Sequence, residues 1–252
     1  MKINPKILHP LSIKNLIRHT TYNILHTLLS TRITIIVAGT NEPSNSNMLA
    51  DTMAHAMRAR GADITKIRLK DLKIEHFGIE CYGPNCPIDG FVKVQDAVKD
   101  ADGIVIASPI WNFSVPAHLV NMIDRMGAFA LDPSHSVGVL KGKPFFYIYT
   151  AGMPSSAWPF MKRMLKHMTL SLHYFGGAVL GTHFEGGCTL GRGIFGLVVD
   201  KRPASLKKME EEGIKFLAQV SEYKRTGLLP LQHRLSQWFW KFAQKMKKKL
   251  GL

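Results

Sequence analysis

The amino-acid sequence predicts an α/β protein with a doubly wound, five-stranded parallel sheet. Five short apolar runs alternate with stretches in which apolar residues recur every three or four positions. Runs of the first kind are typical of buried parallel strands, and stretches of the second kind of the helices that cover them. The chain has no internal repeat and no low-complexity segment, so a single sheet accounts for the whole alternation.

The strand candidates are short segments, too short for helices, of which residues 33–38 form a continuous apolar run. They comprise residues 33–38, 63–69, 103–107, 143–150 and 177–184. The third is followed by a loop at residues 108–115 and then by Pro116, which is well tolerated at a helix start because its missing amide hydrogen would have no partner there. We expect chemistry at this loop, since ligands of open α/β sheets sit beyond the carboxyl ends of the strands.

The helix candidates follow the strands in order. They comprise residues 48–60, 91–99, a stretch from Pro116, 157–173 and 203–223, whereas residues 71–90 have little periodicity. Residues 48–60, for example, place Leu49, Met53 and Met57 on one face. The sequence thus predicts a core domain at residues 33–223 with extensions at 1–32 and 224–252.

The two extensions carry most of the net charge of +15. Residues 1–32 hold five Lys/Arg and residues 224–252 hold eight, and neither segment has an acidic residue. The body between them is therefore nearly neutral. Because the basic residues are terminal and the body has no recognition motif, we do not expect nucleic acid as a partner. The three cysteines are too few for a disulfide framework and favour a reducing, cytoplasmic compartment.

The N-terminal extension has apolar residues at roughly helical spacing, interrupted by Lys14 and Arg18. These charges exclude a membrane-spanning helix. Three interpretations stay open: an extra helix packed on the domain or on a second copy, a segment that contacts a membrane surface, and an organellar transit peptide.

The C-terminal extension predicts a basic amphipathic helix after Pro230. Its apolar residues step by three or four, and lysines fall opposite. Those apolar residues are Leu231, Leu235, Trp238, Phe242, Met246 and Leu250. Either this face contacts an anionic membrane surface, or it packs on the body or on a dimer partner.

Two loops at strand ends contain candidate ligand-binding residues. The first, residues 39–47 (GTNEPSNSN), gathers hydroxyl and amide groups at the start of a helix, where backbone N–H groups and the helix dipole favour a phosphate. Ordinary N-capping by Ser44 or Ser46 would explain part of the pattern. The second loop carries Pro109, Ile110, Trp111 and Phe113, an apolar set that suits a planar ring. One ligand with both a phosphate and a flat ring is indicated.

Together the two loops resemble those of the flavodoxin-like NAD(P)H-dependent FMN reductases, which include quinone and azo-dye reductases. The stretch SPIWNFSVPAHLVNMIDR carries the more specific match, and the resemblance runs from about residue 33 to 184. It implies a flavodoxin-like fold, FMN as cofactor and NAD(P)H as electron donor. It also implies a small-molecule electron acceptor of the quinone, azo or flavin type, and a homodimer.

The resemblance assigns the FMN site by position. It implies that Thr40, Ser44, Ser46 and Asn47 bind the phosphate, and that Ser108, Pro109, Ile110, Trp111, Asn112 and Phe113 border the isoalloxazine ring. Backbone amides of Thr150, Ala151 and Gly152 are expected to point toward the pyrimidine end of the ring. The chemistry itself belongs to the flavin, so no catalytic side chain is assigned.

The sequence departs from the family at several points. Glu42 stands where many members have Arg, and its carboxylate would repel a phosphate unless it points away or pairs with a cation. Trp111 replaces the usual Tyr. Cys81, Cys86 and Cys188 cannot supply four ligands to an iron–sulfur cluster, and zinc with His76 is not expected. Asp124 and Arg125 are expected to form local ion pairs.

A different class of function stays open beside the enzyme. The chain could be a non-catalytic electron-transfer or binding module, with or without flavin, held at a membrane or partner by its basic ends. Glu42 in the phosphate loop favours that alternative, whereas the intact SPIWNFSVP stretch favours the enzyme.

Overall fold

The computed structural model describes residues 30–191, 194 and 196–249. The expectations for the N-terminal extension therefore fall almost entirely outside the described residues. The chain divides into two units, Met1–Ser30 and Thr31–Leu252, and every element named below belongs to the second.

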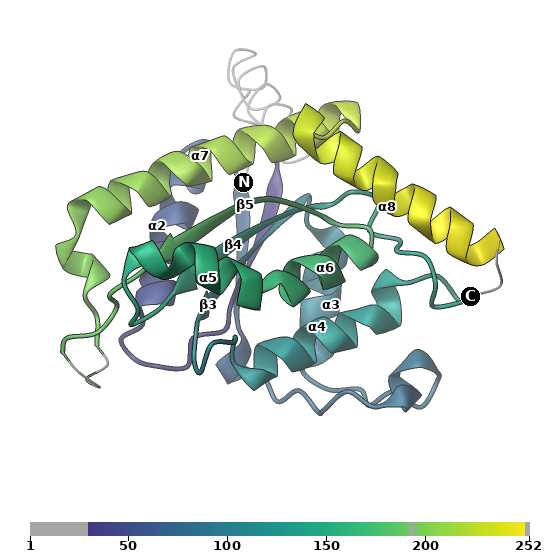
Figure 1. The fold of residues 1–252 in the computed structure, drawn as a ribbon, viewed down its shortest axis with the longest axis horizontal. Coiled ribbons are helices and arrows are strands. Elements are labelled where there is room, and N and C mark those ends of the chain that lie inside the picture. Colours follow the sequence, from purple (N-terminus) through teal and green to yellow (C-terminus); the bar gives the residue numbers. More distant parts are fainter. Residues whose placement is uncertain (1–29, 192–193, 195, 250–252) are drawn as a thin grey trace, which may run out of the picture. The chain divides into compact units, whose positions relative to one another are not determined.

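The second unit is built on one five-stranded sheet, in which all strands run parallel (Figure 1). The strands are β1 Arg32–Val37, β2 Asp63–Arg68, β3 Gly103–Pro109, β4 Pro144–Thr150 and β5 Ala178–Glu185, in the order β2-β1-β3-β4-β5. This confirms the predicted fold class. At the carboxyl edge Val37 pairs with Arg68 on one side and Ala107 on the other, so the loops after β1 and β3 leave the sheet side by side.

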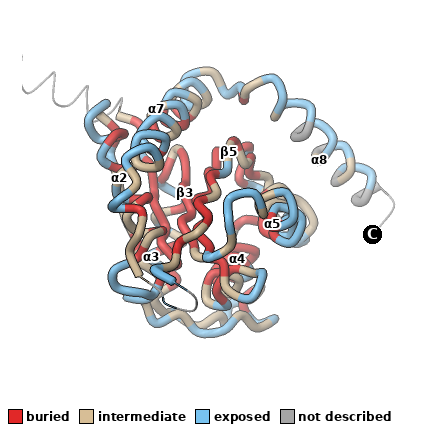
Figure 2. The backbone as a smooth tube through the Cα atoms, turned by 60° about the vertical axis from the view of Figure 1, so that its left-hand side comes forward, coloured by how far each residue is buried: buried red, intermediate tan, exposed pale blue. Residues whose placement is uncertain are grey.

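Helices cover both faces of the sheet. They are α2 Asn45–Arg58, α3 Phe91–Asp100, α4 Ala117–Ala130, α5 Trp158–Met164, α6 Lys166–Tyr174 and α7 Pro203–Thr226, followed by α8 Leu231–Lys249. Helices α2 and α7 bury apolar side chains against one face, and α3, α4, α5 and α6 against the other. Buried residues accordingly concentrate in the strands between the two helical layers (Figure 2). Among the described residues, none of the helices is both long enough and apolar enough to traverse a lipid bilayer.

Three helices differ by more than one residue from their predicted bounds: besides the two described below, α7 runs to Thr226, three residues past its predicted end at residue 223. The single helix predicted for residues 157–173 is wrong: α5 ends at Met164 and α6 begins at Lys166, with Leu165 outside helical geometry (φ −89°, ψ 7°). Met161, Leu165 and Met168 stay buried through the break, so it bends the helix without changing the buried face. No Pro or Gly marks this point in the sequence, and the bend therefore depends on tertiary packing.

Helix α2 begins three residues earlier than predicted. Ser44 is its N-cap, with extended backbone, and its hydroxyl accepts a hydrogen bond from the Asn47 backbone N–H at 3.3 Å. The polar residues 45–47 thus form the first turn of the helix instead of a preceding loop. This places their backbone N–H groups at the carboxyl edge of the sheet.

The irregular segment between β2 and α3 is held by one buried ion pair. The Arg125 guanidinium of α4 donates to both carboxylate oxygens of Asp89, at 2.9 and 3.2 Å, and to the carbonyls of Glu75 and Pro87. Local pairing of Arg125 along its own helix is therefore wrong. The side chain is almost completely buried and finds its partner across the fold, in a segment whose regular structure is limited to two short 3-10 helices, Leu69–Asp71 and Ile79–Tyr82.

Candidate flavin site

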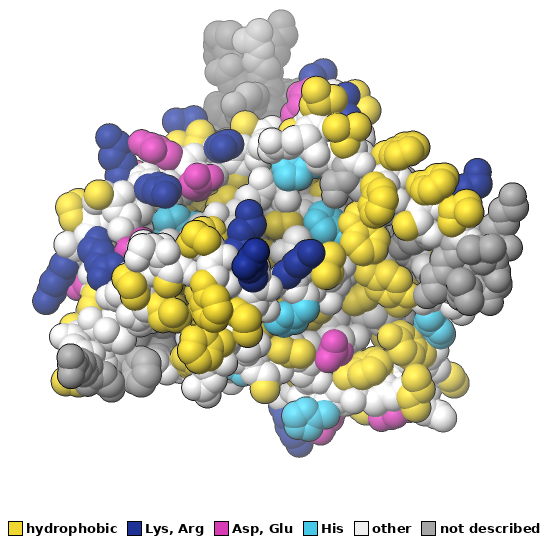
Figure 3. All heavy atoms as spheres, viewed as in Figure 1, with side chains coloured by type: hydrophobic (Ala, Val, Ile, Leu, Met, Phe, Trp, Pro, Cys, Tyr) yellow, Lys and Arg dark blue, Asp and Glu magenta, His cyan; other side chains and the backbone are white. Residues whose placement is uncertain are grey.

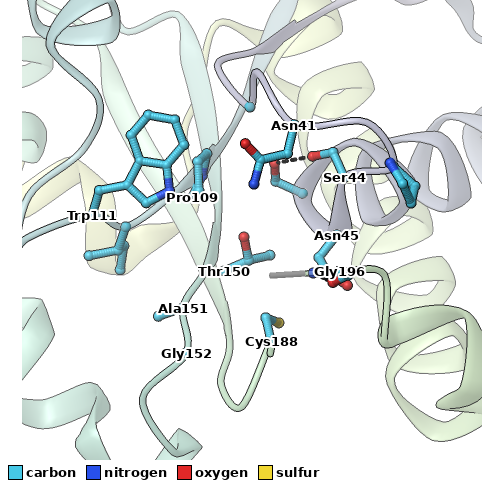
Figure 4. A pocket seen from close by; sticks show the side chains of 14 residues that line it. Asn41, Ser44, Asn45, Pro109, Trp111, Thr150, Ala151, Gly152, Cys188 and Gly196 are labelled. Atoms are coloured by element: carbon cyan, nitrogen blue, oxygen red, sulfur yellow. Dashed lines mark hydrogen bonds between the residues drawn. The ribbon is translucent and has the colours of Figure 1, made fainter. Parts of the chain in front are cut away.

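A pocket opens at the carboxyl edge of the sheet, where β1, β3 and β4 end (Figure 4). Its lining comprises Gly39, Asn41, Pro43, Ser44, Asn45, Ser46, Pro109, Ile110, Trp111, Thr150, Ala151, Gly152, Cys188 and Gly196. Trp111 lies on one side and Ser44 and Asn45 on the other, with Thr150 between them. The structure thus brings together eight of the thirteen predicted residues, from all three predicted loops.

The phosphate loop forms a small cradle around Gly39. The hydroxyl oxygens of Ser44 and Ser46 lie 3.2 Å apart, and a Cβ atom at Gly39 would come within 2.7 Å of each. The space is therefore open because residue 39 has no side chain. Backbone N–H groups in the first turn of a helix have no intrahelical acceptor, so those of Asn45 and Ser46 complete a site suited to an anion.

Glu42 of the phosphate loop is paired with two cations. Its carboxylate accepts a hydrogen bond of 2.6 Å from Lys70, just after β2, and another from Arg68, the last residue of β2. These partners, Lys70 first and then Arg68, lower the pKa of Glu42. Pairing with a cation is the condition under which this residue was expected not to repel a phosphate. The trio carries a net positive charge beside the phosphate loop.

The loop after β3 is a tight turn that presents Trp111. The backbone of Trp111 exchanges hydrogen bonds of 2.8 and 2.9 Å with Ser114, and the two residues between them have left-handed backbone, with φ of 49° at Asn112 and 65° at Phe113. A left-handed conformation is uncommon for a residue as bulky as Phe. Such strain persists only where the surroundings enforce it, and it concentrates at functional sites.

The loop after β4 supplies fewer free amides than expected. The Ala151 N–H donates to the Glu185 carbonyl at 3.0 Å, because β5 continues to pair with β4 as far as Glu185. The expectation that the Ala151 amide points toward a ring is therefore wrong. Thr150 and Gly152 line the pocket, and in Figure 4 the Thr150 hydroxyl points into it.

Five predicted residues do not line the pocket: Thr40, Asn47, Ser108, Asn112 and Phe113. Ser108 is fully buried and donates to the neighbouring Pro109 carbonyl at 2.8 Å. The Asn47 side chain donates to Asp51 at 3.2 Å, whereas its carbonyl oxygen is buried without a hydrogen-bond partner. Thr40 and Asn112 are exposed. Phe113 is half-exposed and meets Phe160 of α5 edge-to-face, with ring centroids 6.0 Å apart.

Sequence reasoning missed several lining residues. Asn45 joins the phosphate loop to the distant segment 196–199: its amide donates to the Gly196 carbonyl at 2.7 Å and accepts from the Val198 N–H at 2.9 Å. The family motif offered a signal for Asn41 and Pro43, which stand inside it. No sequence signal pointed to Cys188 or Gly196, which reach the pocket from beyond β5.

The segment after β5 is fixed by a buried carboxylate. Glu185 accepts hydrogen bonds from Arg202 at 2.7 Å, Ser205 at 3.0 Å and His183 at 3.3 Å. Burial raises the pKa of Glu185, but these hydrogen bonds outweigh it and bring the pKa to about 2. Arg202 also donates to the carbonyls of Gly186 and Gly187 at 2.7 Å each. The clamp therefore positions the backbone that leads to Cys188 in the pocket wall.

The three cysteines are unpaired thiols. Burial raises the pKa of the Cys188 thiol to about 11, so this pocket-lining group stays protonated at neutral pH. Burial, together with its neighbour Cys81, also raises the pKa of Cys86. Within the described part of the chain, no group of three or more His, Cys, Asp or Glu residues is arranged to hold a metal ion.

The family model of the NADPH-dependent FMN reductases matches residues 31–185, which span β1 to β5 and all three pocket loops. The chain belongs to this family. The match ends at Glu185, before the clamp partner Arg202 and before α7 and α8.

Individual proteins that are similar to this chain are also reductases that use FMN or NAD(P)H. An FMN-dependent NADH:quinone oxidoreductase of Nitratidesulfovibrio vulgaris is 38% identical over 86 residues, covering 30% of this chain and 41% of the relative. The match thus spans about two fifths of that relative's length. Among solved structures, an FMN-dependent NADH-azoreductase of Bacillus anthracis in complex with FMN superposes with a TM-score of 0.57 at 17% identity, covering 74% of this chain and 99% of the other. An NAD(P)H:quinone oxidoreductase of Methanothermobacter marburgensis gives 0.56 at 16% identity, covering 73% and 96%.

Proposed function

We propose that this protein is an FMN-dependent oxidoreductase that passes electrons from NAD(P)H to a quinone, azo or flavin-type acceptor. The observation that carries the proposal is the pocket itself, in which a helix N-terminus with two serine hydroxyls faces an indole and the strained turn that presents it. A phosphate and a planar ring on one ligand match these two halves. Membership of the FMN reductase family supports the same ligand.

The residues present fit FMN. The Gly39 cradle has room for phosphate oxygens where a Cβ would otherwise stand, and Ser44, Ser46 and the first-turn amides of α2 would donate to them. Trp111 and Ile110 would contact the ring, and the Thr150 hydroxyl and the Gly152 amide would hydrogen-bond its polar edge. When bound there, FMN supplies two-electron transfer between a nicotinamide and an acceptor.

The protein would contribute to the reaction by positioning the bound FMN and by excluding water from its ring. The clamp at Glu185 and the Asn45 bridge hold the two outer segments of the pocket, and the Trp111 indole in its wall would help to exclude water from a bound ring. No side chain is required as a general acid, since the net reaction takes one proton from solvent: NAD(P)H, H⁺ and a quinone give NAD(P)⁺ and a hydroquinone. The Cys188 thiol in the pocket wall stays protonated at neutral pH, and we assign it no role.

An exposed apolar group formed by the loop after β3 and by α5 supports flat, apolar acceptors. Phe113 and Phe160 meet edge-to-face at about half exposure, and Met164 lies 45% exposed on the same helix as Phe160. Aromatic rings left accessible in this way suit an aromatic acceptor such as a quinone or an azo dye.

We also propose the domain organisation, the location and the oligomeric state of the enzyme. The core at residues 33–223 would form the FMN-binding domain, active in the cytoplasm as a homodimer, with peripheral membrane contact through the C-terminal extension. Exposed apolar side chains on α5 and α8 support an interface or a membrane contact.

The non-catalytic alternative has lost its main support. It depended on repulsion between Glu42 and a phosphate, and Glu42 is paired with Lys70 and Arg68. An electron carrier without nicotinamide activity is then an outcome of the test below.

The test is an absorbance spectrum after incubation with FMN and desalting, followed by anaerobic NADPH or NADH. We expect retained flavin that bleaches within one mixing time. Retained flavin that neither nucleotide bleaches would contradict the enzyme and favour an electron carrier. Thr150→Val should weaken flavin retention about fivefold through one lost hydrogen bond. Thr182→Val, an exposed residue on β5, should leave it unchanged.

A further inference from the structure

Helix α8 carries an apolar stripe that nothing in the described structure covers. The stripe comprises Leu231, Leu235, Trp238, Phe242 and Met246, which follow one another at intervals of three or four residues on one side of the helix. Their exposed fractions are 72%, 69%, 67%, 50% and 39%. Figure 3 shows hydrophobic side chains gathered along this helix. A contiguous exposed set of this kind marks an interaction surface.

The helix contacts the body through other residues. Trp240 stacks on His173 at the end of α6, with ring centroids 6.2 Å apart and planes 16° apart. Trp238 instead stacks on Phe242 within the stripe, at 5.7 Å and 15°. The interpretation in which the aromatic face packs on the body is therefore wrong for the stripe. The body holds one side of α8 and leaves the apolar side outward.

The net charge of the C-terminal segment indicates which kind of partner binds the stripe. From residue 224 to the end the sequence has eight Lys/Arg and no acidic residue. A second copy docked through the same stripe would bring two such basic segments together, and their repulsion would oppose the contact. An anionic lipid surface complements the charge and accepts Trp and Phe at its interface.

We propose that the α8 stripe docks this protein on an anionic membrane surface. Apolar side chains of the stripe enter the interfacial region, and the net positive charge of residues 224–252 attracts the anionic lipid headgroups. If the proposed reductase activity holds, the docking makes a lipid-soluble quinone the acceptor class. NAD(P)H, H⁺ and the quinone then give NAD(P)⁺ and a hydroquinone that stays in the membrane.

The test is flotation of the full-length, FMN-incubated protein with phosphatidylcholine vesicles, with and without phosphatidylglycerol. We expect flotation only with the anionic lipid. Trp238→Ser with Phe242→Ser should weaken binding about tenfold or more, because two aromatic side chains no longer leave water. Lys245→Glu should weaken it about fivefold or more. Protein that stays at the bottom with anionic vesicles overturns the proposal.

Two control variants test whether vesicle binding depends on the stripe and its charge or on any exposed apolar or basic residue. Ile88→Ser removes an apolar side chain that is 94% exposed on the body, and Lys207→Glu reverses an exposed charge on α7; neither should change flotation. If the double variant instead turns a dimer into a monomer in light scattering, with no flotation of the parent, the stripe is an interface between copies and the proposal fails.

A second readout distinguishes this proposal from the proposed activity. Reduction of a long-chain quinone embedded in anionic vesicles should slow in the double variant, whereas reduction of a water-soluble quinone should not. Flotation without any NAD(P)H oxidation would refute the activity and leave the docking intact. Oxidation with a soluble quinone but without flotation would refute the docking alone.

Discussion

The guanidinium of Arg202 donates a 2.7 Å hydrogen bond to the carboxylate of Glu185, and the two residues lie on opposite sides of the loop that reaches the pocket. The same guanidinium binds the carbonyls of Gly186 and Gly187. A side chain that makes three such contacts fixes the loop backbone. Because Arg202 itself does not line the pocket, its effect on ligand binding must pass through that backbone.

Arg202→Ala should weaken FMN binding about tenfold, since the loop loses its positioning contacts. Fluorescence titration of FMN measures the affinity. Arg202→Lys should recover only part of it, because an ammonium cannot reproduce the fork of hydrogen bonds. A simple loss of stability would lower the melting temperature in both variants and leave the affinity of the folded fraction unchanged. Lys201→Ala, an exposed neighbour, is the control.

Acid should destabilise the protein through Glu185. Its pKa in the folded state is about 2, below its ordinary value of 4.5, so the unfolded chain takes up the proton first as the pH falls. The stabilisation is complete above about pH 4.5 and is lost progressively toward pH 2. Melting temperatures across this range should fall less steeply in Glu185→Gln, which has no carboxylate to titrate. Equal slopes in the two proteins would show that other carboxylates dominate.

Gly39→Ala should reduce FMN affinity at least tenfold with little effect on folding. The added methyl group would lie 2.7 Å from the hydroxyls of both Ser44 and Ser46, so it would occupy the cradle or displace the donors. Equilibrium dialysis with FMN measures the change. Gly83→Ala is the matched control, because its Cβ would meet only the Glu80 carbonyl at an ordinary 3.6 Å. Unchanged affinity in Gly39→Ala would place the phosphate elsewhere.

Glu42→Gln should strengthen FMN binding a few-fold. Loss of the carboxylate leaves Lys70 and Arg68 unneutralised beside the phosphate loop, which raises the local positive potential. The gain should shrink as salt is added, because the cations are near the surface. Titrations at low and high ionic strength test both statements. Asp63→Asn, at the opposite end of β2, removes an equal charge and should have no effect. Weaker binding in Glu42→Gln would mean that the carboxylate orients the cations.

Arg125→Met should destabilise the fold by about 3–5 kcal/mol, because the carboxylate of Asp89 loses its counter-charge and keeps only the backbone N–H groups of Glu75 and Phe91. Urea unfolding measures the loss. Adding Asp89→Asn to this variant should restore part of the stability, since the uncompensated charge is removed. Arg58→Met, exposed on α2, should change little. A loss no larger than that of Arg58→Met would show that the pair contributes no net stability.

The sequence by itself determined the sheet and its two central loops. Apolar runs at β1, β3 and β4 can only be buried strands, and their hydrophobicity, β propensity and length agree, so no tertiary information was needed. Polar and aromatic residues directly after these strands then had to meet at one edge, because parallel strands place their carboxyl ends together. Thus Ser44, Trp111 and Thr150 were predicted in one pocket, where they lie.

Tertiary structure alone decided the contacts made by residues far apart in the chain. The pairing of Glu42 with Lys70, of Arg125 with Asp89 and of Glu185 with Arg202 depends on where turns bring the backbone, and charge patterns along the chain do not specify this. The bend at Leu165 and the outward face of α8 have the same origin. A helical pattern shows which side of a helix is apolar, but only packing shows whether that side meets the body or solvent.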